Sequence, residues 1–181
     1  MNYKIVSWNV AGLRAMLKKD GFHEFIQNPE NDYTIICLQE TKCESKQVEL
    51  PEYIVKKYPY RYWKHCDGNS QRKGLNGVTV WSKIIPLYIF DKEIDFDNEG
   101  RFLVIDFEHF ILINVYTPNS QSLNSERCGF REAWNNTIID YVLTIQNNKP
   151  IIFCGDFNVC NEPIDVVNIK SKINKYPGCF D

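Results

Sequence analysis

Several features are missing from this sequence, and each absence narrows what the protein can be. No apolar run approaches the roughly 18–20 residues that a membrane helix needs, and no Cys-x-x-Cys pair occurs among the seven cysteines. The sequence therefore predicts neither a membrane span nor a zinc module. Widely spaced thiols inside apolar runs, such as Cys37 and Cys154, are typical of buried cysteines in a reducing compartment. With no signal segment, repeat or linker either, we expect an intracellular protein with no membrane partner.

Arginine is scarce, and the formal net charge is −2. This balance argues against a protein that coats nucleic acid nonspecifically, because backbone phosphates are held by Lys and Arg. It is compatible with an enzyme whose acidic metal site offsets a basic rim. The 181 residues are 44% hydrophobic and 24% charged, which is ordinary globular usage and enough for one domain with a buried core.

Short β-rich runs alternate with helix-like stretches along the chain. The runs 101–108 and 110–116, which one residue separates, predict antiparallel neighbours. Strands are predicted at 4–10, 33–39, 77–82, 102–107, 110–116 and 150–154. Apolar residues three and four apart predict a helix over 127–146, with shorter ones at 13–19 and 22–27. The polar stretch 161–181 is typical of a loop. The mixture predicts an α/β domain with a largely antiparallel sheet.

Unusual polar residues stand at the carboxyl ends of several predicted strands. If these strands share a sheet, their ends converge on one pocket, the usual place for chemistry in such folds. The residues concerned are Asn9, Glu40, Tyr116, Asn119, Asp156 and Asn158.

These residue types suit metal-assisted phosphate chemistry. The Glu40 carboxylate and the Asn9 amide are hard oxygen ligands of the kind that Mg²⁺ prefers. Asp156 could orient or deprotonate an attacking water. Asn158, two residues further on, would face the same way in an extended segment and donate to phosphoryl oxygens as charge builds. The same donor role is open to Asn119 and to the hydroxyl of Tyr116.

Each of these residues also has a structural interpretation. A single Glu after a strand is more often a solvated charge or a helix cap. A Tyr at a strand end is often a core aromatic, and Asn or Asp beside glycine or proline commonly forms a turn. Taken singly, the residues leave both interpretations open.

Four motifs, taken in order, favour the catalytic interpretation. They are S-W-N-V-A-G-L-R at 7–14, L-Q-E-T-K at 38–42, N-V-Y-T-P-N at 114–119 and C-G-D-F-N-V at 154–159. Together they resemble the exonuclease III and apurinic/apyrimidinic endonuclease family, within the endonuclease/exonuclease/phosphatase superfamily. The likeness runs from about residue 3 to residue 181 and includes Asn98-Glu99-Gly100-Arg101 and the start of the long helix.

The resemblance implies a DNase I-like, four-layer α/β sandwich whose two similar sheets pack face to face, with residues 1–181 as the amino-terminal part of that single domain. It implies hydrolysis of double-stranded DNA 5′ of an abasic sugar, with 3′-5′ exonuclease activity in some members and Mg²⁺ (or alternatively Mn²⁺) as cofactor. The implied metal set is Asn9, Glu40, Asp156 and Asn158. The implied catalytic set is Tyr116, Asn119, Asp156 and Asn158.

Two elements of that family are not found in this sequence. Ala11 stands where some relatives carry an Asp, and no Ser-Asp-His motif occurs, since no histidine follows His109. We therefore expect a fragment of a longer reading frame, or a chain that a second chain completes. Such a half would leave the apolar inner face of its sheet uncovered and prone to association.

Candidate contacts to the DNA backbone are Arg72 and Lys73, together with Arg127 and Arg131 at the start of the long helix. Two rival functions stay open. A phosphatase of the same superfamily, acting on inositol phosphates or lipids, would share the G-D-x-N element but not L-Q-E-T-K. A non-catalytic remnant would bind DNA or a protein partner.

Overall fold

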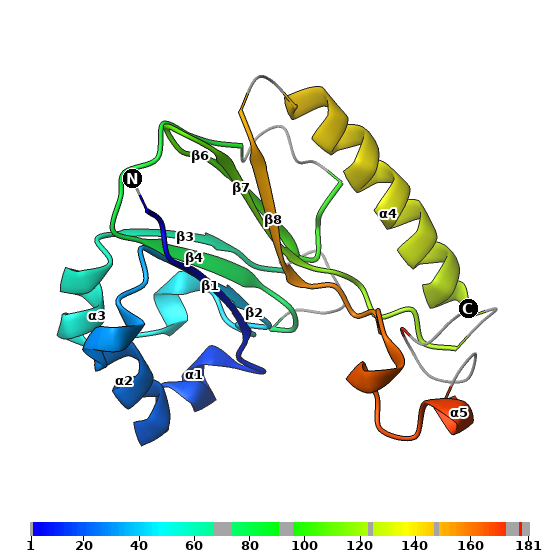
Figure 1. Ribbon diagram of the computed structural model, residues 1–181, viewed down its shortest axis with the longest axis horizontal. Helices are drawn as coiled ribbons and strands as arrows, with labels where there is room; N and C mark the ends of the chain where they lie inside the picture. Colours follow the sequence, from blue (N-terminus) through cyan, green and yellow to red (C-terminus); the bar gives the residue numbers. More distant parts are fainter. Residues whose placement is uncertain are drawn as a thin grey trace. The chain divides into compact units, whose positions relative to one another are not determined.

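The computed structural model describes residues 2–66, 74–90, 96–122, 125–146, 149–172 and 178, which fall into two compact units (Figure 1). The first unit consists of Met1–Tyr116 and Lys149–Asp156, and the second of Thr117–Asn148 and Phe157–Asp181. None of the helices in the described ranges combines the length and the apolar character that crossing a bilayer requires.

The first unit holds two four-stranded sheets. The first sheet has the order β1-β2-β4-β3 and the second the order β5-β6-β7-β8. β1 is parallel to β2 and β7 is parallel to β8, while the other neighbours are antiparallel, as expected for 102–107 and 110–116. The strands are β1 (Ile5–Asn9), β2 (Ile35–Gln39), β3 (Tyr60–Lys64), β4 (Val78–Ser82), β5 (Tyr88–Ile89), β6 (Phe102–Asp106), β7 (Ile111–Tyr116) and β8 (Ile151–Asp156).

Every residue of strand β2 is buried. Because successive side chains of a strand point to opposite sides of the sheet, β2 contributes to two separate cores. Ile36 and Leu38 join a core that includes Phe22 of a neighbouring helix. Ile35 and Cys37 face a second core that includes residues of β6 and β7. Three short helices cover the outer face of this sheet (Figure 1), namely α1 (Leu13–Met16), α2 (Asp20–Gln27) and α3 (Glu52–Lys57).

The two sheets pack face to face, with a polar connection inside the apolar core. The side chain of Asn114, on β7, is fully buried. Its Oδ1 accepts a hydrogen bond from Gln39 Nε2 at 2.7 Å, and its Nδ2 donates to the carbonyls of Leu38 and Thr79 at 3.2 and 3.0 Å. The expectation of an uncovered inner face is therefore wrong, because this stretch of chain supplies strands to both sheets, which cover each other.

The second unit is built around the long helix α4 (Glu126–Ile145), which confirms the predicted helix to within one residue at each end. The Ser125 side chain caps it by accepting a hydrogen bond from Cys128 N at 3.0 Å. Trp134 and Ile138 are its buried residues. The stretch expected to be a loop contains α5 (Ile169–Lys172) and a 3₁₀ turn at Pro163–Asp165, so that prediction is wrong in part.

Candidate active site

The carboxyl ends of two parallel strand pairs meet at one edge of the first unit. Asn9 is the last residue of β1, and Glu40 directly follows β2. Tyr116 and Asp156 end β7 and β8 and face each other in the register. Strands β1 and β8 contact one another across the two sheets. Parallel strands end at the same edge, so four of the predicted residues come together although they are far apart in sequence.

The amide of Asn9 bridges two carboxylates. Its Nδ2 donates to Glu40 Oε1 at 3.0 Å and to Asp156 Oδ2 at 2.6 Å. Its Oδ1 accepts the backbone N–H of Ala11 at 2.9 Å, which orients the amide. The turn-forming interpretation of Asn9 is therefore confirmed, and the same side chain hydrogen-bonds two carboxylates. Its role at a metal ion stays a prediction.

Glu40 is held in a conformation that residues other than glycine seldom adopt, with φ of 51°. Such strain clusters at functional sites. Burial pushes the pKa of its carboxyl up, but hydrogen bonds outweigh burial and hold the pKa below its usual value. The donors are Asn9, Lys42 and Tyr116, with Lys42 Nζ at 2.8 Å from Oε2. Glu40 is therefore ionised at neutral pH.

Tyr116 donates its hydroxyl to the Glu40 carboxylate. Burial, that hydrogen bond and the neighbouring negative charges raise the pKa of Tyr116 to about 12, although the nearby Arg101 acts in the opposite direction. The phenol therefore stays a neutral hydrogen-bond donor across the physiological pH range.

The donor set fits one hard divalent cation. Within the described ranges, no group of three or more His, Cys, Asp and Glu side chains is arranged to hold a metal ion. Mg²⁺ does not need such a group, because it usually binds through one or two carboxylates and keeps its waters and substrate phosphate. Glu40 and Asp156 supply two carboxylates. The Asn9 amide faces these carboxylates with its nitrogen, so Asn9 would have to turn its oxygen toward them to serve as a metal ligand.

Asn119 and Asn158 belong to the second unit, where Asn119 holds a turn and Asn158 links two separate segments. Asn119 Oδ1 accepts the backbone N–H of Gln121 at 2.9 Å, an Asx-type turn. Asn158 has φ of 48°, and its Nδ2 donates to the Thr117 carbonyl at 2.8 Å. The Asn119 contact agrees with the turn-forming interpretation, and the phosphate contacts of both residues stay predictions.

The predicted DNA contacts have mixed positions. Arg131 donates to the carbonyls of Pro118 and Phe157 at 2.8 and 2.9 Å, so it joins the segments that follow β7 and β8 within the second unit. The Arg127 guanidinium lies over the Phe130 ring at 4.3 Å. The last two candidates, Arg72 and Lys73, lie outside the described residues. DNA contact stays a prediction for all four.

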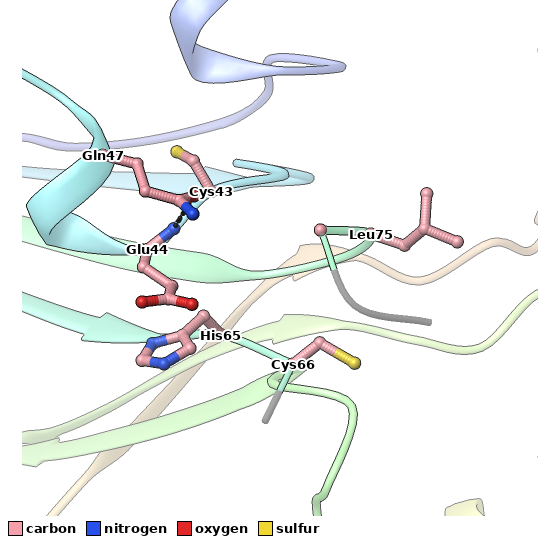
Figure 2. Close-up of a pocket in the computed structure, with 7 residues that line it drawn as sticks. Cys43, Glu44, Gln47, His65, Cys66 and Leu75 are labelled. Atoms are coloured by element: carbon pink, nitrogen blue, oxygen red, sulfur yellow. Dashed lines mark hydrogen bonds between the residues drawn. The ribbon is translucent and has the colours of Figure 1, made fainter. Parts of the chain in front are cut away.

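A separate pocket on the first unit gathers two thiols, a histidine and a carboxylate (Figure 2). Its lining includes Cys43, Glu44, His65 and Cys66. Figure 2 shows the Glu44 carboxylate directed toward the His65 ring, whereas the two sulfur atoms point in different directions. Glu44 also pairs with Lys46 Nζ at 2.7 Å. The four groups do not converge on one point, so this pocket is not a second metal centre.

Two residues near the site were not predicted to belong to the catalytic or metal-binding set. Lys42 forms the ion pair with Glu40, and the Arg101 guanidinium lies 4.6 Å from the centre of the Tyr116 ring. The signal for Arg101 was the Asn98-Glu99-Gly100-Arg101 element, whose likeness to the family carried no chemistry by itself.

Comparison with known proteins gives consistent matches. The model of the endonuclease/exonuclease/phosphatase family matches residues 6–176. The chain is 40% identical to an exodeoxyribonuclease of Bacillus subtilis (strain 168), over 94% of this chain and 64% of that protein. It is 37% identical to the DNA repair nuclease APEX1 of Danio rerio, over 93% and 53%. An AP endonuclease structure from Archaeoglobus fulgidus superposes with a TM-score of 0.75 at 27% identity, over 99% of this chain and 66% of that one.

Proposed function

The chain belongs to the endonuclease/exonuclease/phosphatase family, and we propose that it hydrolyses the phosphodiester bond 5′ of an abasic site in double-stranded DNA. We propose that the same site also catalyses 3′-5′ exonuclease cleavage. The observation that carries this proposal is the bridge from the Asn9 amide to the Glu40 and Asp156 carboxylates, beside the Tyr116 hydroxyl. The names of the similar proteins, which are DNA nucleases, favour this branch over a phosphatase.

We propose distinct roles for the gathered side chains. Asp156 orients the attacking water and accepts its proton, for which a carboxylate in hydrogen-bond reach is suited. Asn9 holds that carboxylate in place through the 2.6 Å hydrogen bond. Tyr116, neutral at working pH, donates to a nonbridging phosphate oxygen as negative charge develops there. Asn119 and Asn158 would add amide donors to the same oxygens.

Mg²⁺ (or Mn²⁺) would be held by Glu40, Asp156 and Asn9, with Asn158 as a further ligand, and would polarise the phosphoryl oxygen and stabilise charge on the leaving oxygen. The residues present fit this requirement because the carboxylates of Glu40 and Asp156 converge on the Asn9 amide. Arg72, Lys73, Arg127 and Arg131 are the proposed contacts to backbone phosphates, which position DNA without reading its sequence.

We propose that the full activity needs residues beyond these 181, in the same reading frame or on a second chain. The chain spans 64% of the length of the Bacillus subtilis relative and 53% of the Danio rerio one. Strands β1 and β8 are both edge strands of their sheets, and unpaired edges accept further strands. A stable monomer by light scattering that binds no apolar dye and incises DNA at the relatives' rates would contradict this proposal.

The function is tested with a duplex oligonucleotide that carries one abasic site, with Mg²⁺ or with a chelator. We expect a single cut 5′ of the abasic sugar that leaves a 3′-hydroxyl and that disappears with the chelator. Phosphate release from inositol phosphates, without incision, would instead favour the phosphatase. A folded preparation that performs neither reaction but binds DNA would favour the non-catalytic remnant.

Replacement of Tyr116 by phenylalanine is expected to lower the incision rate by about 10²–10³-fold, because one hydrogen-bond donor to the phosphate is lost. The shape of the pH–rate profile between pH 6 and 10 should not change. The pKa of about 12 means that Tyr116 stays protonated throughout that range. Rates measured at several pH values for both proteins check this. An alkaline limb below pH 10 that vanishes in Tyr116→Phe would mean that the phenol titrates during the reaction.

A further inference from the structure

We propose that Arg101 is a positioning residue: its guanidinium lies against the face of the Tyr116 ring and thereby fixes the direction of the Tyr116 hydroxyl. This inference deepens the proposed function and rests on it. The guanidinium lies 4.6 Å from the centre of the Tyr116 ring, and its Nη1 donates to the backbone carbonyl of the same residue at 3.1 Å. One side chain therefore holds both the ring and the backbone of Tyr116.

Arg101 is itself fixed on every side. Only 2% of its surface is exposed. Its Nε forms an ion pair with Glu99, and its Nη2 donates to Asn76 Oδ1 at 2.8 Å. A buried guanidinium that donates a hydrogen bond from each of its three nitrogens loses much of its freedom to move, which makes it a rigid support. Because it is buried, Arg101 is not placed to grip DNA phosphates, so its charge acts on the tyrosine.

The backbone that carries Arg101 is also locked. Asp97 Oδ2 accepts the backbone N–H groups of Arg101 and Phe102 at 2.6 and 2.7 Å. Gly100 has φ of 66°, and a Cβ there would lie 2.3 Å from the carbonyl carbon of His65, so only glycine fits this close approach. The Glu99-Gly100-Arg101 element thus places the Arg101 guanidinium against the ring of Tyr116.

The direction of the Tyr116 hydroxyl matters because two groups can accept its hydrogen bond. The hydroxyl donates to Glu40 in this structure, and in the proposed reaction it donates to phosphate. A cation over an aromatic face is attracted to the ring, so Arg101 opposes tilting of the ring away from the site. A misplacement of about 1 Å at a reacting group can cost about 100-fold in rate.

The test combines a double-mutant cycle with a spectroscopic signal. Incision kinetics are measured for Arg101→Met, Arg101→Lys, Tyr116→Phe and the Arg101→Met/Tyr116→Phe double variant. We expect Arg101→Met to lower kcat by about 10–100-fold with little change in KM, and Arg101→Lys to recover part of the loss, since lysine keeps the charge but not the planar fork. In the Tyr116→Phe background, Arg101→Met should cost little more, because the two residues act as a unit.

The second readout needs no substrate. The ring ¹H–¹³C NMR signal of Tyr116 is assigned by its loss in Tyr116→Phe. We expect this signal to move in Arg101→Met and to stay in place in Arg61→Met, a matched arginine of the same unit that donates to the carbonyls of Val55 and Tyr58. If the wild-type protein, completed by the further residues that full activity is proposed to need, does not incise DNA, the proposed function fails, and the ring signal alone decides the positioning.

Two results would overturn the inference. One is a double variant whose loss of kcat equals the product of the losses in the two single variants, because the residues would then act independently. The other is an unchanged Tyr116 ring signal in Arg101→Met. If that variant does not fold, Glu99→Gln takes its place, because it keeps Arg101 but weakens its ion pair. It should move the ring signal in the same direction by a smaller amount, and an unmoved signal would again contradict the proposal.

Discussion

Replacement of Asp156 by asparagine should lower the rate of incision by about 10²–10⁴-fold, the usual contribution of a positioned general base. Asparagine has nearly the same shape, and its oxygen can still accept the 2.6 Å hydrogen bond from Asn9 Nδ2. It cannot accept a proton from water. The loss should therefore appear in kcat, with the stability of the protein little changed.

The measurement is single-turnover incision of the abasic duplex at saturating enzyme, together with urea denaturation of both proteins. Asp32→Asn is the matched control, because Asp32 is an exposed carboxylate of the same unit that pairs with Lys83 away from the site. It should leave the rate unchanged. An Asp156→Asn protein that retains a rate within threefold of wild type would show that Asp156 is not the proton acceptor.

The second large effect is expected at Gly155, one residue before Asp156. This glycine has φ of 140°, and a Cβ added to it would lie 1.9 Å from the carbonyl oxygen of Val115 on the paired strand. Gly155→Ala should therefore lower the free energy of unfolding by about 2–5 kcal/mol, through overpacking and backbone strain together. The added methyl group should displace the end of β8, which carries Asp156. The incision rate should therefore fall as well.

Urea denaturation checks this prediction, with Gly21→Ala as the control. Gly21 lies in α2 of the same unit, and nothing lies within 4 Å of a Cβ added there. Alanine in that helix should stabilise the protein by roughly 0.5–1 kcal/mol. Unfolding of Gly155→Ala at the same urea concentration as wild type would show that the close approach of β8 to β7 at Gly155 does not contribute to stability.

Most of the fold could be predicted from the sequence where a single pattern was strong. The apolar runs that became β1, β2, β4, β6, β7 and β8 were recognised, as was the long helix, because hydrophobic periodicity dominates such segments. The elements that were missed are short or mixed in character. β3 reads Tyr-Arg-Tyr-Trp-Lys with every residue half-buried, and β5 has two residues. Residues 20 and 21 were left between the two predicted short helices, but Asp20 lies in the first turn of α2, where an acidic residue is favourable.

Four of the predicted site residues, Asn9, Glu40, Tyr116 and Asp156, come together in the structure, but their contacts could not be predicted. The four ordered motifs identified the family, which the family match over residues 6–176 confirms. No pattern could show that Asn9 turns its nitrogen toward carboxylates up to 147 positions away, because that geometry depends on the register of two parallel strand pairs. For the same reason the buried Asn114, which joins the sheets, could not be distinguished from any polar residue in a strand.

The central claim is that Asn9, Glu40 and Asp156 hold one divalent cation. It is tested most directly by titrating the ¹⁵N- and ¹³C-labelled protein with Mn²⁺ and recording which NMR signals broaden, since an unpaired electron relaxes nearby nuclei. We expect the side-chain signals of these three residues to broaden first, Mg²⁺ to compete with Mn²⁺, and Glu40→Gln to weaken the broadening. Broadening centred elsewhere in the chain, with these three signals unaffected, would contradict it.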